Sequence, residues 1–82
     1  MLDKLCVDKY FKKHPKLEVF IGAGTISLKM SRKILDVDRY YMFDVFCDLV
    51  EAGAVYKSGC NNWRATKELQ EYLNERRGNI DE

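Results

Sequence analysis

The stretch of sequence that decides the fold is DVDRYYMFDVFCDLVEAGAVYKSGCNNWRAT, residues 36–66. Its first half predicts a helix over Arg39–Ala52, because apolar residues recur there at the i, i+3, i+4 and i+7 spacing of one helix face: Met42, Val45, Phe46 and Leu49. Asp38 is a favourable N-cap at one end of this helix. Gly53 stands at the other end, where helices commonly finish with a residue in the left-handed conformation.

The second half of the same stretch predicts a β-hairpin that follows the helix. Ala54–Lys57 alternates as a strand, residues 58–62 have the composition of a turn, and Trp63–Ala65 is the return strand. Thr66 is then a favourable N-cap for a last helix. The apolar stripe of that last helix consists of Leu69, Tyr72 and Leu73.

A shorter helix is predicted before this stretch, over Leu28–Leu35. Thr25–Ser27 is expected to be extended, and the hydroxyl of Ser27 can cap the helix. Apolar residues at i, i+4 and i+8 predict its buried face: Ile26, Met30 and Ile34. Three cations lie on its outer side: Lys29, Arg32 and Lys33.

The N-terminal part predicts one further helix and one ambiguous segment. The helix covers residues 2–13 and has lysines on one side and apolar groups on the other: Leu2, Leu5, Cys6, Tyr10 and Phe11. Pro15 ends this helix, because the residue before a proline is disfavoured in the helical conformation. Residues 16–24 fit either a strand, favoured by their β-branched and aromatic side chains, or a second short helix that begins at Pro15.

Length and composition allow one small domain, and the predicted helices and strands make it α+β and mostly helical. The 82 residues are 46% hydrophobic and 12% aromatic, which is enough for a single core. We expect the domain to span residues 1–78, with the last helix ending at Gly78, and a frayed polar tail over residues 79–82. A net charge of +1 argues against a disordered chain and against a histone-like binder of nucleic acid. No apolar run approaches the ~18 residues needed to cross a bilayer.

Cysteine, histidine and glycine patterns give little basis for catalysis, a metal or a cofactor. Cys6, Cys47 and Cys60 include no CxxC pair and His14 is the only histidine, so a four-ligand zinc site is not expected. The N-terminus has no signal-peptide pattern, and the cysteines therefore predict free thiols in a reducing cytoplasm. The GAG tripeptide at residues 22–24 lacks the context of a phosphate loop. We expect a non-enzymatic cytoplasmic protein without cofactor or membrane association.

The small net charge hides an uneven distribution along the chain. Residues 1–34 hold eight basic and three acidic groups, a balance of +5, and residues 35–52 hold one against five, a balance of −4. Residues 53–67 hold three against none (+3), and residues 68–82 hold two against five (−3). A function that depends on charge must therefore use one particular patch.

The order of these elements resembles the winged helix-turn-helix fold. The sequence LVEAGAV at residues 49–55 is similar to the L-V-E-x-G-x-V hinge where a recognition helix turns into the first strand of a wing. WRAT at residues 63–66, followed by a helix, matches the exit from a short wing. The likeness covers about residues 25–73. It implies a wing of two or three strands, a C-terminal helix, and a recognition helix over residues 39–52 that reads the major groove of double-stranded DNA.

The resemblance also implies a set of DNA contacts in this sequence. The recognition helix would present Arg39, Tyr40 and Phe43, with Asp44 beside them, to the edges of the bases. Phosphates would be held by cations of the preceding helix and of the wing: Lys29, Arg32, Lys33, Lys57 and Arg64. Asn61 and Asn62 at the wing tip would reach the minor groove, although turn chemistry alone also explains both asparagines.

Acidic residues on the recognition helix leave a second function open. The recognition helix carries Asp38, Asp44, Asp48 and Glu51, and an acidic group near a phosphate repels it and weakens the DNA interpretation. Asp48 and Glu51 are expected toward the far end of the helix, away from the DNA groove. Exposed aromatic groups beside acids suit a protein partner, so the alternative is a winged-helix module for protein–protein interaction. The DNA interpretation predicts a transcriptional regulator or an accessory factor of replication or of a mobile element. It also predicts a homodimer, formed through the first helix (Tyr10 and Phe11) or the last (Leu69, Tyr72 and Leu73).

Three aromatic residues define how the recognition helix is rotated. We expect Phe46 to be the most buried aromatic residue and Phe43 to lie on the outer edge, with burial of Phe43 against residues 16–21 as the alternative. Trp63 is expected to pack on the last helix, against Leu69 and Tyr72, rather than stack on a base. The expected core consists of Met30, Ile34, Met42, Val45, Phe46, Leu49, Val55 and Trp63.

Overall fold

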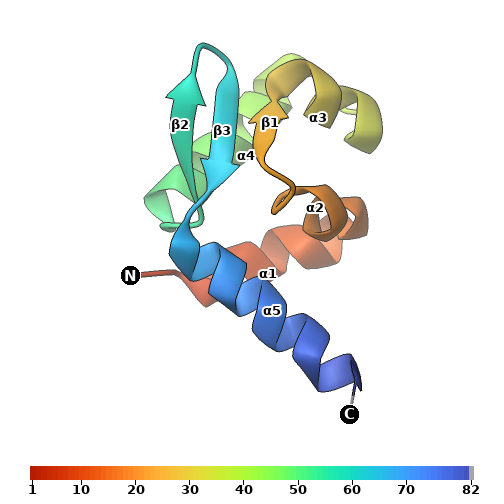
Figure 1. Ribbon diagram of the computed structural model, residues 1–82. Helices are drawn as coiled ribbons and strands as arrows, with labels where there is room; N and C mark the ends of the chain where they lie inside the picture. Colours follow the sequence, from red (N-terminus) through yellow and green to blue (C-terminus); the bar gives the residue numbers. More distant parts are fainter. Residues whose placement is uncertain (82) are drawn as a thin grey trace.

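A computed structural model describes residues 1–81 of the chain, and the side chains of residues 1–77. The described residues form five helices and three strands, an α+β arrangement that is mostly helical, as predicted (Figure 1). In chain order these are α1 (Lys4–Lys13), α2 (Pro15–Phe20), β1 (Thr25–Ser27), α3 (Leu28–Leu35), α4 (Arg39–Glu51), β2 (Val55–Gly59), β3 (Asn62–Ala65) and α5 (Lys67–Asp81).

The three strands form one antiparallel sheet in the order β1-β3-β2. Ile26 and Lys57 both stand opposite Trp63 in the register, and Arg64 stands between Thr25 and Tyr56. Because directly opposed residues share a sheet face, Ile26 and Trp63 lie on one face and Arg64 on the other. The first face is buried at Ile26 and Trp63 and packs toward the helices (Figure 1), whereas Lys57 on the edge strand β2 is exposed.

Helix α4 is the central helix, and its predicted ends are confirmed within one residue. The Asp38 carboxylate accepts a hydrogen bond from the Tyr41 backbone amide at 2.8 Å, which satisfies one of the unpaired donors of the first turn. Gly53 has a φ of 78°, and a Cβ added there would lie 2.9 Å from the Met1 carbonyl oxygen. Phe46 is fully buried and stacks on Trp63 with ring centroids 4.2 Å apart.

Helix α1 runs antiparallel to α4, and three contacts along their length fix this pairing. At one end the Asp3 amide donates to the Ala52 carbonyl at 2.7 Å. In the middle the Tyr10 hydroxyl donates to the Asp48 carboxylate, and burial together with this bond raises the pKa of Tyr10. At the other end His14 Nε2 and the Tyr41 hydroxyl oxygen are 2.8 Å apart. The C-terminal end of α1 therefore lies beside the first turn of α4.

The ambiguous segment after Pro15 is helical. Pro15 occupies the first turn of α2, where its missing amide hydrogen costs no helical hydrogen bond. Leu17, Phe20 and Ile21 are buried, so the apolar residues that suggested a strand instead form one side of a short helix. The strand alternative is wrong because the i, i+3, i+4 spacing of these three residues matches a helix face.

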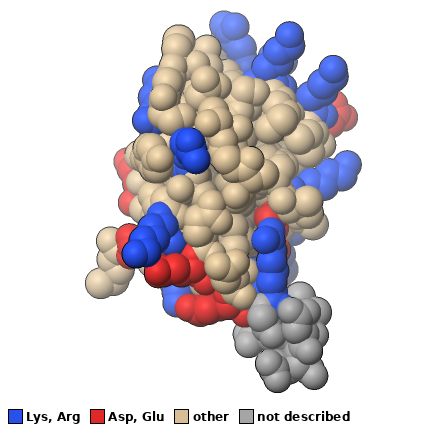
Figure 2. Space-filling model, in the orientation of Figure 1, with Lys and Arg blue, Asp and Glu red and all other residues tan. Residues whose placement is uncertain are grey.

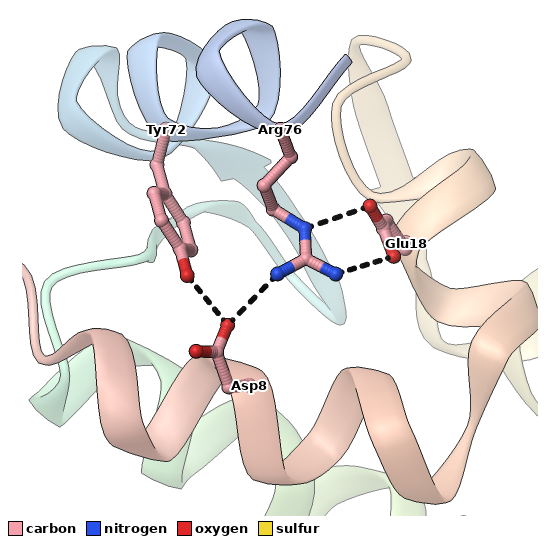
Figure 3. A network of polar contacts seen from close by, with 4 residues as sticks. All are labelled: Asp8, Glu18, Tyr72 and Arg76. Carbon is pink, nitrogen blue, oxygen red and sulfur yellow. Dashed lines mark hydrogen bonds and ion pairs between the residues drawn. The ribbon is translucent and has the colours of Figure 1, made fainter. Parts of the chain in front are cut away.

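Helix α5 is attached to the first two helices by the polar network in Figure 3. Arg76 donates to both carboxylate oxygens of Glu18, at 2.9 and 3.1 Å, and to Asp8 at 3.2 Å. The Tyr72 hydroxyl donates to the same Asp8 oxygen at 2.7 Å. Thr66 begins the helix as predicted, since its Oγ1 accepts from the Leu69 amide at 3.2 Å. Helix α5 continues to Asp81, so the predicted helix end at Gly78 is wrong. Residues 79–81 of the expected tail are helical, Glu82 lies outside the described residues, and fraying of this tail stays a prediction.

Two helices are rotated relative to the sequence prediction. In α3, Met30 is 40% exposed, and the fully buried residue is Ser31, whose hydroxyl donates to the Ser27 carbonyl at 2.8 Å. Met30 was assigned to the core by continuing a row from Ile26, but Ile26 belongs to a strand and does not share the helical period. In α1, Leu5 is 84% exposed and Val7 is buried, because the row that faces the core is Val7, Tyr10 and Phe11.

The remainder of the expected core is confirmed. Met42, Val45, Phe46, Leu49, Val55 and Trp63 are buried in one cluster, and Ile34 packs against it while partly buried. The same cluster contains four residues that were offered as a dimer surface: Tyr10, Phe11, Leu69 and Leu73. These four side chains are used inside a single chain, so that expectation is wrong for them. Among the described residues, no helix is long and apolar enough to cross a membrane.

Candidate nucleic-acid interface

Helices α3 and α4 are joined by a turn of three residues, Asp36–Val37–Asp38. Asp36 ends α3 in the left-handed conformation with a φ of 56°. Glycine is the usual residue there, but aspartate tolerates this conformation better than most side chains. Asp38 then caps α4. This short turn brings the outer side of α3 close to the first turn of α4.

Five of the ten predicted DNA contacts line one pocket between α3, the start of α4 and the hairpin tip. We call it the cationic pocket; it measures about 330 Å³ and is lined by Ser27, Leu28, Lys29, Arg32, Arg39, Asn61 and Asn62. Three cations from two helices converge there with two amide side chains. None of the three forms a salt bridge with another described residue. The pocket therefore offers several hydrogen-bond donors and uncompensated positive charge.

A second, larger pocket adjoins the first and shares Leu28, Arg39 and Asn61 with it. This aromatic pocket measures about 560 Å³ and is lined by Leu28, Arg39, Tyr40, Phe43, Asp44 and Asn61. Tyr40 is 72% exposed and Phe43 40% exposed, so both rings are accessible. The Arg39 guanidinium lies 5.2 Å from the centre of the Tyr40 ring. Because they share three lining residues, we refer to the two pockets together as the groove; it lies at the N-terminal half of α4.

The hairpin tip is held against this groove by its backbone. Asn61 has a φ of 62° and its carbonyl accepts a hydrogen bond from the Leu28 amide at 2.9 Å. The turn explanation for Asn61 is therefore supported, because asparagine is among the residues that tolerate a positive φ. Asn61 nevertheless lines both pockets. Ser27 and Leu28 also line the cationic pocket, which the sequence did not predict. Ser27 was assigned only as a helix cap, and Leu28 has an apolar side chain that does not indicate a binding site.

Three predicted contacts lie outside the two pockets. Lys33 follows Lys29 by one turn of α3 and extends the same exposed side. Lys57 is exposed on β2, opposite Trp63. Arg64 points from the sheet face opposite to that of Trp63, so it does not share a surface with the core-facing side of the hairpin. Figure 2 shows Lys and Arg side chains projecting over α3 at the upper right, whereas most of the acidic groups gather lower in the view.

The acidic residues of α4 are divided between its two ends. Asp44 lines the aromatic pocket, where it weakens the attraction for a phosphate. Asp48 accepts the hydrogen bond from Tyr10. Asp48 and Glu51 line a separate pocket of about 350 Å³ at the C-terminal end of α4, together with Asp3, Cys6, Lys9 and Ala52. Asp48 and Glu51 therefore lie away from the groove, as the sequence predicted.

The aromatic residues confirm the predicted rotation of α4 and give Trp63 two ring partners on that helix. Phe46 is the most buried aromatic residue, and Phe43 lies on the outer edge, so the alternative of a buried Phe43 is wrong. Trp63 is buried, which excludes stacking on a base. Its ring stacks on that of Phe46 and meets the edge of Phe43 at 6.0 Å, and both partners are on α4. Leu69 of α5 belongs to the same core cluster as Trp63, and the expected packing of Trp63 on that helix stays a prediction.

Searches of protein-family models, of curated proteins and of solved structures found no match to this chain. Cys6, Cys47 and Cys60 are free thiols in the structure, and burial raises the pKa of Cys6. No group of three or more metal-ligating side chains comes together within the described residues. The groove along α4 is the place where accessible aromatic rings, amides and unpaired cations meet.

Proposed function

We propose that the protein is a winged helix-turn-helix domain that binds double-stranded DNA, without enzymatic activity. The order of helices and strands, the three-residue turn between α3 and α4, and an antiparallel sheet in which β1 pairs with the hairpin support this assignment. A helix-turn-helix places the N-terminal residues of its second helix on base edges in the major groove. In this chain that helix is α4.

The observation that carries the proposal is the cationic pocket. Lys29, Arg32 and Arg39 lie together without acidic partners among the described residues, at the N-terminal end of α4. Keeping several like charges together destabilises a small domain by repulsion, and an anionic ligand removes that repulsion. Phosphate groups of a duplex are such a ligand, and their neutralisation releases condensed counterions.

In this proposal the residues of the groove have different tasks. Lys29 and Arg32 bind backbone phosphates, and Lys33, Lys57 and Arg64 extend that contact. Arg39 donates in a fork to a guanine edge, and Tyr40 and Phe43 contact thymine methyl groups or sugars. Asn61 and Asn62 at the hairpin tip face the same duplex. Asp44 accepts from the exocyclic amine of a cytosine, a pairing typical of an acidic side chain.

The proposal is tested by fluorescence anisotropy with a labelled random-sequence duplex over a series of salt concentrations. The wild type is expected to bind at low salt and to weaken steeply as salt rises. Replacing Lys29 and Arg32 by alanine removes two phosphate contacts and should lower the slope of log K against log salt by roughly 2. The matched control replaces Lys4 and Lys67 by alanine. These residues begin α1 and α5, near the C-terminal end of α4. An equal loss in both double variants, or no binding by the wild type, would overturn the proposal.

A second function, binding to a protein partner, is favoured by the aromatic pocket. Tyr40 and Phe43 expose large apolar surfaces beside Asp44, which resembles the centre of a protein–protein interface more than a phosphate site. A gel shift on random duplex DNA at low salt separates the two functions. Absence of any shift at micromolar protein would favour the protein partner, since even non-specific DNA binders associate under those conditions.

A further inference from the structure

The turn between α1 and α2 carries a second group of basic residues that the proposed DNA contacts do not include. Lys12, Lys13 and Lys16 are exposed and surround this turn. Lys13 and Lys16 line a pocket of about 190 Å³ together with His14, Leu35 and Asp36. We call it the turn pocket. It joins the end of α1 to the end of α3, two segments that are about 20 residues apart in the sequence.

The turn pocket lies next to the first turn of α4, on another side of it from the groove. His14 Nε2 is 2.8 Å from the Tyr41 hydroxyl oxygen, and the Lys13 amine lies 5.3 Å from the centre of the Tyr41 ring. Tyr41 directly follows Tyr40, which lines the aromatic pocket on the groove side. The first turn of α4 therefore stands between two basic surfaces.

Charge is also separated along the pair of antiparallel helices. The end of the pair that holds His14 and Tyr41 carries the lysines of the turn, and its acids are Asp36 in the pocket and Asp38, which caps α4. The other end holds Asp3, Asp48 and Glu51 in one pocket with a single cation, Lys9. Neither Lys13 nor Lys16 forms a salt bridge with another described residue. The basic end of the pair is the end that carries the N-terminus of α4.

We infer that Lys13 and Lys16 form a second phosphate-binding surface, which holds the DNA backbone on the side of α4 opposite to Lys29 and Arg32. This inference rests on the proposed function. A helix that enters the major groove, which is about 12 Å wide, has a sugar–phosphate strand on each side of it. Lys29 and Arg32 bind the phosphates of one DNA strand, and Lys13 and Lys16 bind those of the other.

The chemistry of the turn pocket fits phosphodiesters rather than bases. Lysine amines act as point charges on flexible stems, which suits a phosphate and gives no bidentate reading of a base edge. Asp36 lies in the same pocket and reduces the attraction, so the contact contributes affinity without sequence preference. The lysines of the turn are therefore expected to change the salt dependence of binding and to leave the preferred sequence unchanged.

The experiment compares three double variants by anisotropy on the same duplex over a salt series. Lys13→Ala with Lys16→Ala should lower the salt slope by roughly 2 and raise Kd roughly 10- to 30-fold at about 0.15 M salt. Lys13→Arg with Lys16→Arg keeps both charges and should retain the wild-type slope. Lys4→Ala with Lys67→Ala removes two lysines from the other end of α4 and should also retain it. Thermal unfolding of each variant checks that the fold is kept.

The outcomes separate this inference from the proposed function. Wild-type binding with an unchanged slope in the Lys13→Ala, Lys16→Ala variant would overturn the second phosphate surface and leave the groove in place. A lower salt slope in the Lys13→Arg, Lys16→Arg variant as well would also overturn the inference. It would show that the substitutions change the structure of the turn, since both positive charges are kept. No DNA binding by the wild type would overturn both proposals. A lower slope in the alanine variant alone, with the same preferred sequence, supports the inference.

Discussion

Two regions of the molecule use arginine in opposite ways. Arg76 on α5 donates to Glu18 and Asp8 (Figure 3), so its charge is paired within the fold. Its guanidinium also lies 5.4 and 5.7 Å from the ring centres of Phe11 and Tyr72. Arg39 at the start of α4 contacts the ring of Tyr40 and has no salt-bridge partner among the described residues. A cation that the fold has already paired contributes to stability, whereas an unpaired cation in a pocket is free to bind a ligand.

The largest effect is expected beneath the groove, at Phe46. Replacing Phe46 by alanine removes a fully buried ring that stacks on Trp63, and should lower the free energy of unfolding by roughly 3–5 kcal/mol. That loss is comparable with the whole stability of a small domain. Urea denaturation followed by circular dichroism measures it.

The matched change is Phe43→Ala, one turn earlier on the same helix. Phe43 is partly exposed, so the loss of stability should be about 1 kcal/mol or less, while DNA binding weakens. Equal destabilisation by the two substitutions would mean that the groove is part of the core and not a surface for a ligand.

The next largest effects are expected when Arg39 and Arg76 are replaced by alanine, one at a time. Arg39→Ala should leave stability nearly unchanged and weaken DNA binding by about 1–3 kcal/mol at one base position. Arg76→Ala should lower the free energy of unfolding by about 1 kcal/mol, because a third of its side chain is exposed and solvent screens the ion pairs. Its DNA binding should be unchanged once the variant is folded.

Unfolding and anisotropy measurements on both arginine variants form a two-by-two comparison. The distinction between paired and unpaired cations fails if Arg39→Ala destabilises the fold as much as Arg76→Ala does. It fails equally if Arg76→Ala weakens binding to DNA.

A smaller effect is expected at Asp36, the single acid of the turn pocket. Asp36→Asn keeps a residue that tolerates the left-handed conformation and should change stability by about 0.5 kcal/mol or less. Removing its negative charge beside Lys13 and Lys16 should tighten DNA binding severalfold at low salt. Unchanged affinity in the anisotropy assay would mean that the duplex does not approach the turn.

The smallest effect concerns pH and His14. Burial, and then the charge of Lys13, lower the pKa of His14 below its ordinary value of 6.5. Below pH 6.5 the unfolded chain therefore binds a proton more readily than the folded protein, so stability is complete above this pH and falls as the pH decreases. His14→Gln should flatten the dependence of the unfolding midpoint between pH 7 and pH 5, and an unchanged pH profile would contradict the assignment.

Local signals in the sequence predicted the centre of the fold well. The bounds of α3 match the prediction and those of α4 differ by one residue, because Ser27, Asp38 and Gly53 determine helix ends through contacts with their immediate neighbours. The burial of Phe46 and the exposure of Phe43 followed from a regular helical period. Met30 and Leu5 were misplaced, since the rotation of a short helix is set by its packing on other elements.

The candidate site was predicted only in part. The convergence of Lys29, Arg32, Arg39 and the asparagines followed from the likeness to a winged helix. Lys13 and Lys16 were missed because their position depends on the antiparallel packing of α1 on α4, a long-range contact that no local pattern encodes. The basic run KKHPK at residues 12–16 was the one signal that pointed to them.

The most direct measurement is a titration of ¹⁵N-labelled protein with a short duplex at low salt, followed by NMR. Amide resonances of the groove should shift progressively as duplex is added: Lys29, Arg32, Arg39 and Asn61. Those of Lys13 and Lys16 in the turn should shift as well. Resonances around Tyr72 and Arg76 should stay in place, because the Tyr72 hydroxyl and the Arg76 guanidinium are already bonded to carboxylates within the fold. Shifts confined to the α5 side, or no shifts at all, would contradict a DNA-binding surface along α4.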